Sequence, residues 1–175
     1  MKRYAYIAAI GALCVGNAVA QTPLPPQKPI VIATEIGEIA TQSDKVQVLV
    51  AATVTQKQTS CKIQIRDKSM MGGQFDLDPK DIALVAKLLQ EASDKVVAGH
   101  TFSGHAGKAS VTVADEQGQS IVILRFEADG ITFSSHEFNL DADNASSLAR
   151  ILSRGKSVSD WLGARLDALQ PKPQP

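Results

Sequence analysis

Apolar and polar residues alternate most regularly between positions 109 and 115, where Val111 and Val113 fall on one face of an extended chain. This period of two is typical of a strand with one buried face. Glu116-Gln117-Gly118 and Asp129-Gly130 then supply residues that favour turns. We therefore expect three consecutive antiparallel strands in this part of the chain, over residues 109–115, 121–127 and 131–138.

A helical period begins after Asp78-Pro79. The Asp78 carboxylate can accept hydrogen bonds from the free amides of a helix start, and proline at the first helical position leaves no amide unpaired. The apolar residues between 82 and 89 then recur on one helical face. The sequence therefore predicts a helix that begins at Pro79.

The chain resembles itself when position 74 is aligned with position 137, a shift that we call the repeat offset. The segment QFDLD at 74–78 then falls on EFNLD at 137–141, and the helical positions 85–89 fall on 148–152. Residues 46–92 and 109–155 therefore predict two homologous halves. One half alone would bury too little apolar surface to be stable, so we expect the halves to form one pseudo-symmetric domain over residues 30–169.

This pattern predicts an α+β fold: a mainly antiparallel sheet backed by helices, built from two pseudo-symmetric strand-strand-strand-helix halves plus a C-terminal helix. In the first half, residues 68–73 replace part of the third strand with a glycine-containing stretch, which predicts a degraded or bulged strand. A further strand over 30–39 is expected at the sheet edge. Gly155 is expected to cap the second helix, and the last helix to begin at Ser157 or Ser159.

The two ends of the chain have a different character. Residues 1–20 begin with two basic residues, continue as an apolar run and end in Ala18-Val19-Ala20, a pattern typical of a secretory signal peptide cleaved before Gln21. Residues 21–29 and 170–175 are rich in proline, which predicts a flexible segment and a disordered tail. We expect a periplasmic or secreted product that has no integral membrane segment once the signal is removed.

Composition narrows the class of function. Residues 1–20 hold two bases and no acid, so their removal leaves 16 basic and 18 acidic side chains, a net charge of −2. The predicted architecture, with Phe-x-Leu-Asp before each helix, is similar to that of Pur-type single-strand-binding proteins, and this resemblance would imply binding of single-stranded nucleic acid. The net negative charge and the few aromatic residues argue against nucleic acid as a partner, and we transfer no binding residues.

The segment between the halves, residues 97–108, carries His100 and His105 among three glycines. A flexible loop could bring imidazoles together, and His136, with Met70 or Met71, could complete a site for copper or zinc. Two histidines without a fixed scaffold are weak evidence for such a site, and Met70 aligns with Phe133, which favours packing. The metal hypothesis therefore names His100, His105 and His136, and no cofactor is predicted.

Other reactive side chains have structural interpretations. Only Cys61 remains after signal cleavage, and it shares one strand face with Ile63 and Ile65, which predicts a buried, inert thiol. The acids before each helix match helix caps better than a calcium loop. Ser103 beside His105 could begin a hydrolytic arrangement, but adjacency in sequence does not set the geometry of a nucleophile and its base.

Two functional hypotheses from different classes follow. The preferred one is a non-catalytic binding module that engages a protein or another envelope component through its sheet edge or through the segment between the halves. The alternative is a small metal-binding envelope protein that uses the three histidines, and an unrecognised hydrolase is a third, less favoured reading. An enzymatic role is thus not favoured by the sequence.

Overall fold

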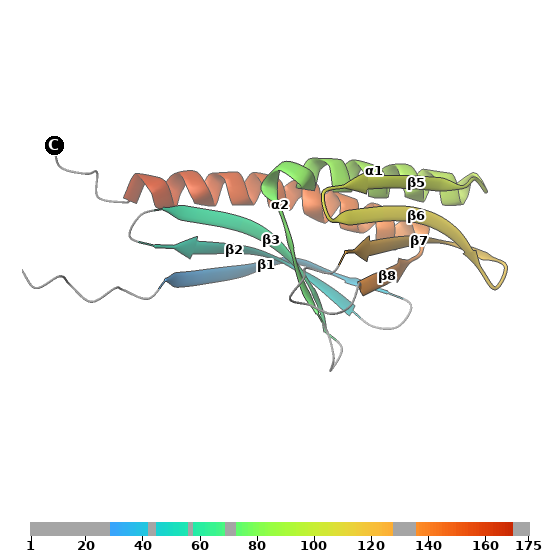
Figure 1. The fold of residues 1–175 in the computed structure, drawn as a ribbon, viewed down its shortest axis with the longest axis horizontal. Coiled ribbons are helices and arrows are strands. Elements are labelled where there is room, and N and C mark those ends of the chain that lie inside the picture. The colour runs from blue at the N-terminus through green and yellow to red at the C-terminus, as the bar shows by residue number, and fades with distance from the viewer. Residues whose placement is uncertain (1–28, 42–44, 56–57, 69–72, 128–135, 170–175) are drawn as a thin grey trace, which may run out of the picture.

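A computed structural model describes residues 29–41, 45–55, 58–68, 73–127 and 136–169 of the 175-residue chain (Figure 1). The signal peptide and the two proline-rich ends fall outside these residues, apart from Pro29, and so do Met70, Met71 and the Asp129-Gly130 turn. In chain order the elements are β1 (Ile30–Ala40), β2 (Lys45–Val54), β3 (Thr59–Asp67), β4 (Gln74–Leu77), α1 (Pro79–Val97), β5 (Phe102–Ala106), β6 (Ala109–Glu116), β7 (Gln119–Phe126), β8 (His136–Leu140) and α2 (Ala142–Leu169).

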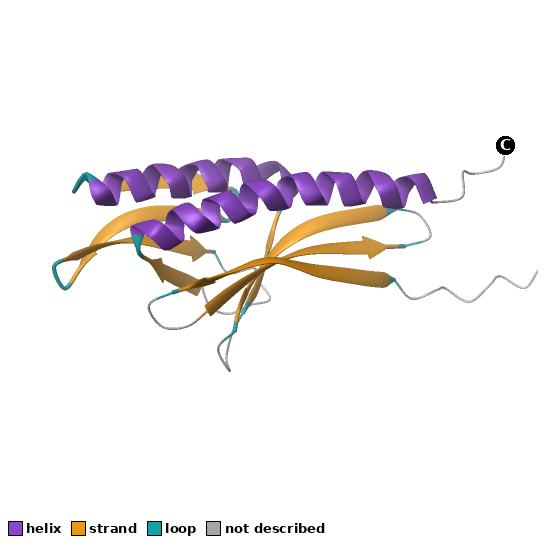
Figure 2. Ribbon diagram, turned by 180° about the vertical axis from the view of Figure 1, so that it is seen from behind, coloured by secondary structure: helices purple, strands orange, loops and turns teal. Residues whose placement is uncertain are grey.

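The strands form two antiparallel four-stranded sheets, in the orders β1-β2-β3-β4 and β5-β6-β7-β8. Both helices lie on one side of these sheets, so the fold has two layers (Figure 2). The predicted α+β class is confirmed. The predicted turn at Gln117-Gly118 is also present, with positive φ at both residues, as a two-residue hairpin of this kind requires.

Each half has four strands before its helix, one more than the predicted unit. The predicted edge strand at 30–39 is present as β1. Its counterpart β5 lies within residues 97–108, where the sequence predicts a flexible segment and no strand, so that prediction is wrong. Gly37 in β1 pairs with Val48, and Gly104 in β5 pairs with Val111, the residue that the repeat offset aligns with Val48. The two first strands therefore occupy equivalent places in the two sheets.

The helices are exchanged between the halves. Helix α1 follows the first sheet but packs against β5, β6 and β7, whereas α2 follows the second sheet and packs against β1, β2 and β3 (Figure 2). Close contacts fix both placements: Leu88 of α1 lies against Gly104, and Ile151 of α2 lies against Gly37. Because the repeat offset also aligns Leu88 with Ile151, the exchange follows the pseudo-symmetry of the repeat.

The two helices run antiparallel, side by side. The Ser93 hydroxyl donates a hydrogen bond to the carbonyl oxygen of Ala142 at 2.8 Å. At the next turn the Ser146 hydroxyl donates to the Gln90 amide oxygen at 3.0 Å. These contacts connect the end of α1 to the start of α2, and so join the halves a second time.

Helix α2 does not stop at Gly155, contrary to the prediction of a cap and a separate last helix. It runs unbroken to Leu169. Gly155 lies where the helix touches the first sheet, and a Cβ atom there would come within 2.4 Å of Ile36 Cδ1 and 2.8 Å of Ile63 Cδ1. The glycine therefore serves close packing of helix on sheet. From sequence alone, that role was indistinguishable from a helix end.

The buried core joins both halves and includes an aromatic cluster at their junction. Phe75 of β4 stacks on Phe126 of β7, with ring centroids 5.0 Å apart, and meets Phe138 of β8 edge to face at 6.0 Å. Phe75 and Phe138 are equivalent residues of the repeat. The halves thus contact each other through the side chains that gave the clearest match in the self-comparison.

The described helices were also compared with the length and hydropathy that a membrane crossing requires. Neither α1 nor α2 contains a stretch long and apolar enough to span a bilayer.

Candidate functional site

The histidine-containing segment is ordered by the fold. Gly99 has φ +68°, and the amides of Gly99 and His100 donate to the carbonyl oxygens of Val96 and Lys95 at 3.1 and 2.9 Å. This pair of bonds is the glycine-based cap that commonly ends a helix. The expected flexible loop around His100 is therefore wrong, because its backbone completes the end of α1.

His105 and His136 lie at opposite edges of one sheet. His105 is exposed on β5, and His136 is on β8, with β6 and β7 between them. Neighbouring strands are about 4.8 Å apart, so these two strands are separated by about 14 Å. The structure thus does not bring the predicted ligands together, and no group of three His, Cys, Asp or Glu residues arranged to hold a metal occurs among the described residues.

His136 has a contact that its position in sequence did not reveal. Its Nε2 lies 3.0 Å from the Asp67 Oδ2 at the end of β3, in the other sheet. The imidazole ring also stacks on Phe75, with centroids 5.2 Å apart. His136 therefore connects the two sheets beside the aromatic cluster.

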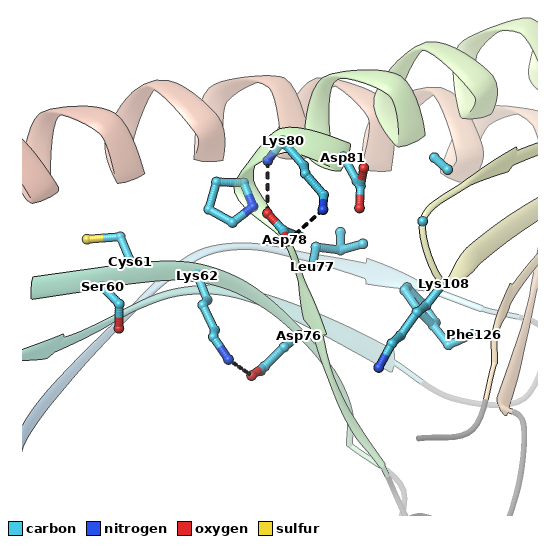
Figure 3. A pocket seen from close by; sticks show the side chains of 13 residues that line it. Ser60, Cys61, Lys62, Asp76, Leu77, Asp78, Lys80, Asp81, Lys108 and Phe126 are labelled. Atoms are coloured by element: carbon cyan, nitrogen blue, oxygen red, sulfur yellow. Dashed lines mark hydrogen bonds and ion pairs between the residues drawn. The ribbon is translucent and has the colours of Figure 1, made fainter. Parts of the chain in front are cut away.

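Cys61 is half-buried rather than fully buried, and it borders a pocket of about 660 Å³ between β3, the start of α1 and the β5–β6 turn (Figure 3). Burial raises the pKa of its thiol, and the Asp167 carboxylate raises it further, against a smaller opposite effect of a hydrogen bond with Ser159. The described residues that line the pocket include no histidine. The predicted inert character of the thiol is consistent with this pKa, because the reactive thiolate is disfavoured.

The charged side chains of this pocket are largely paired with one another. Lys62 Nζ lies 2.9 Å from Asp76 Oδ2, and Lys80 Nζ lies 3.4 Å from Asp78 Oδ2 (Figure 3). Asp78 also accepts from the Lys80 amide as the cap of α1, and Asp141 accepts from the Asn144 amide at 2.7 Å at the start of α2. The interpretation of these acids as helix caps is confirmed.

Strand β1 presents the most unusual surface. It forms one edge of its sheet and pairs only with β2. Its first three side chains are large, apolar and exposed: Ile30 by 63%, Val31 by 64% and Ile32 by 42%. The segment 30–34 has no charged residue and no proline, although these are the usual means of protecting a free edge from pairing with another strand.

A groove of about 480 Å³ follows the inner half of this edge, between β1 and α2. We call it the β1 groove. Its β1 wall carries Ile36, Glu38, Ile39 and Ala40, and its α2 wall carries Asn144, Ser147, Arg150, Ile151 and Arg154. The groove is thus bounded by β1 on one side and by α2 on the other, and it ends where the exposed outer part of β1 begins.

The charges on the two walls differ. Glu38 of β1 is neutralised by Lys45, at 3.1 Å, and by Lys68, and these hydrogen bonds lower the pKa of its carboxyl group. Arg154 on the α2 wall is exposed and has no ion pair within the described part of the chain. The groove therefore has a cationic helix wall.

Comparison with other proteins adds little to this picture. No family model matches the chain, and no curated protein matches its sequence. Among solved structures it is similar to SsgB of Streptomyces coelicolor, whose mutations correlate with longitudinal cell division during sporulation, with 11% identity and a TM-score of 0.33 over 78% of this chain and 92% of that one.

A second similar structure is an SsgA-like sporulation-specific cell division protein from Thermobifida fusca, with 10% identity and a TM-score of 0.32 over 81% of this chain and 94% of that one. Similarities of this size transfer neither fold nor function. The site must be interpreted from the chain's own residues.

The α2 wall of the β1 groove has a signal in the sequence. Ser147, Arg150 and Arg154 recur at intervals of three and four positions, which places them along one side of a helix. The edge itself was expected, but the exposure of its first residues was not.

Proposed function

We propose that this protein is an exported, non-catalytic binding module that engages a partner protein by adding a strand to the free edge of β1. The observation that carries the proposal is the run of exposed, uncharged residues from Ile30 to Thr34 on an unpaired edge. Added strands gain affinity from main-chain hydrogen bonds and specificity from alternate side chains.

The other sheet edges are less suited to this role. Strand β5 has five residues, β8 has five and β4 has four, whereas β1 has eleven. In addition, Gly104 in β5 is closely covered by Leu88. Among the described strands, only β1 offers a long edge whose apolar side chains are exposed on both faces of the sheet.

The bulge in β1 limits where a partner can bind. The pairing with β2 shifts between Glu35 and Gly37, so the edge has two regular stretches, Ile30–Glu35 and Gly37–Ala40, and only the first lies outside the groove. Bulges twist an edge and interrupt pairing. A partner strand therefore has about six residues of regular backbone to pair with before it reaches the groove beside α2.

Photo-crosslinking in the native cell tests this proposal. A benzophenone amino acid is placed at Val31 or Ile32, and in a matched control at Leu84, an exposed apolar residue of α1 (44% exposed). We expect a discrete protein adduct from both β1 positions on irradiation and none from Leu84. Absence of an adduct at β1, or the same adduct at all three positions, would show that the edge is not a binding site.

A further inference from the structure

The outer part of β1, residues 30–34, is open on both faces of its sheet (Figure 1). Ile32 belongs to a cross-strand row with Ala52 and Cys61, and α2 lies over the Cys61 end of that row. The helix there is above β3, with β2 between it and β1. Ile32 is 42% exposed on the helix side of the sheet, and Val31 is 64% exposed on the other side. A whole sheet, and not only a single strand, can therefore approach this edge.

The sequence of this segment is complementary to itself. Partner residues of antiparallel strands lie on the same face of a sheet, so a two-fold axis between two copies of β1 must pass through a residue paired with its own copy. An axis at Ile32 pairs Val31 with Ala33 of the second copy. Ile30 then pairs with Thr34, so all five pairs are uncharged. We call this arrangement the central register.

The neighbouring registers are less favourable. An axis at Val31 would pair only residues 30–32 before it reached Pro29, which has no amide to donate to the ladder. An axis at Ala33 would place the Glu35 carboxylate opposite an apolar side chain and would extend the pairing into the bulge. The central register leaves both the proline and the carboxylate outside its five pairs.

The central register also covers the exposed apolar side chains of both copies. The two Ile32 side chains meet on the helix side, next to Ile30 of each copy, and Val31 packs beside Ala33 on the opposite side. Two-fold pairing uses the same edge in both molecules. The assembly therefore closes at two copies and leaves no β1 edge for further strand addition.

Resting on the proposed function, we infer that the strand added to β1 is β1 of a second copy of this chain, paired in the central register. The first sheets of two molecules, of four strands each, then form one continuous sheet. A charged partner strand would find no opposite charge on residues 30–34, whereas a second copy presents only uncharged side chains to them. An alternating apolar pattern that matches itself on both faces is what a two-fold contact requires.

Sedimentation equilibrium of the purified protein at tens of micromolar tests this inference. We expect twice the mass of one chain for the wild type. Ile32→Asp removes an apolar side chain from each copy and places two carboxylates on the axis, which is expected to weaken the dimer by about a hundredfold or more. Leu84→Asp is the matched control, because Leu84 is 44% exposed but lies on α1, and it should leave the mass unchanged.

Both substituted side chains are exposed, and far-ultraviolet circular dichroism checks that the variants are folded. A wild-type protein that is monomeric at these concentrations overturns the inference. So does a dimer that persists in the folded Ile32→Asp variant, or one that Leu84→Asp dissociates equally.

Cysteine crosslinking tests the register. In a Cys61→Ser background, Ile32→Cys places two thiols directly opposite each other, with Cβ atoms about 5 Å apart, whereas Val31→Cys places them diagonally, about 7–8 Å apart. Disulfides need Cβ atoms about 4 Å apart. Mild oxidation is therefore expected to link Ile32→Cys into dimers severalfold faster than Val31→Cys, and Ala33→Cys combined with Val31→Cys should restore the linkage. Faster linkage of the single Val31→Cys variant overturns the central register.

Photo-crosslinking at Val31 in the cell separates the possible failures, because the mass of the adduct identifies its members. An adduct of two copies of this chain supports both the proposed function and the inferred occupant. An adduct with a different protein, together with a monomeric purified protein, leaves β1 as a binding site but overturns the second copy as its occupant. A monomer that gives no adduct overturns both.

Discussion

Replacement of glycine by alanine is expected to have opposite effects on stability at two positions of α2, Gly155 and Gly163. A Cβ atom at Gly155 would lie 2.4 Å from Ile36 Cδ1 and 2.8 Å from Ile63 Cδ1, whereas one at Gly163 would lie 3.6 Å from the Cys61 sulfur. The first distances are too short for carbon atoms, and the last is an ordinary contact. Alanine therefore has to displace neighbours at 155 but not at 163.

The expected magnitudes follow from two opposing effects. Alanine in place of glycine inside a helix stabilises it by about 0.8–1 kcal/mol. Overpacking a fitted core costs about 1–3 kcal/mol. Gly155→Ala is therefore expected to lower the free energy of unfolding by about 1 kcal/mol, and Gly163→Ala to raise it by up to about 1 kcal/mol.

Urea unfolding followed by far-ultraviolet circular dichroism measures both values, with the slope of the transition as a check that only stability has changed. Ile36→Val provides a further control, because it removes the Cδ1 atom that lies closest to the new methyl group. In the double variant we expect Gly155→Ala to cost less than it does alone, which is a favourable coupling between neighbours. If Gly155→Ala stabilises the protein as much as Gly163→Ala does, the close approach of α2 to the first sheet is wrong.

Four further outcomes are expected. Fragments 30–97 and 98–169 do not fold as separate monomers but regain helical circular dichroism when mixed, because each helix covers the sheet of the other half; a stable monomer of either would contradict the exchange. Cys61 reacts with iodoacetamide at pH 8 more slowly in the folded than in the unfolded protein, because its pKa is raised; the associated stability is present below the unfolded pKa and is lost as pH rises through the folded pKa. Terminal sequencing of protein expressed in a Gram-negative host gives Gln21 as the first residue, and an intact N-terminus would refute export. Metal analysis of the purified protein gives no stoichiometric copper or zinc; a metal lost on His100→Ala would establish the alternative function.

The repeat was predictable because equivalent residues carry the same packing role. Phe75 and Phe138 meet at the junction of the halves, and the helices that follow them have matching apolar faces. The equivalence of β1 and β5 was hidden by a change of offset, because Gly37 and Gly104 are further apart in sequence than their pairing partners Val48 and Val111. The difference lies in the connection between the first and second strands, which is shorter in the second half.

The exchange of helices could not be derived from the sequence. An amphipathic helix has the same pattern whichever sheet it covers, since both sheets offer a similar row of small and branched apolar residues. The close contacts at Gly37 and Gly104 show the placement in the structure. From sequence alone, a glycine in a strand could equally mark a bulge, a bend or the close approach of another element. The three linker glycines likewise suggested flexibility, although Gly99 ends α1 and Gly107 forms a hairpin turn with φ +58°.

The candidate binding site lies where the pseudo-symmetry is broken. Strand β1 has eleven residues and its counterpart β5 has five, while α2 has 28 residues and its counterpart α1 has 19. Both extensions are at the same end of the molecule (Figure 1). The buried core cluster lies between Ile39 and Leu152, and Leu162 of the additional helical part packs against it. Because the helix exchange places α2 of the second half beside β1 of the first, a groove with walls from both halves arises only in the joined chain.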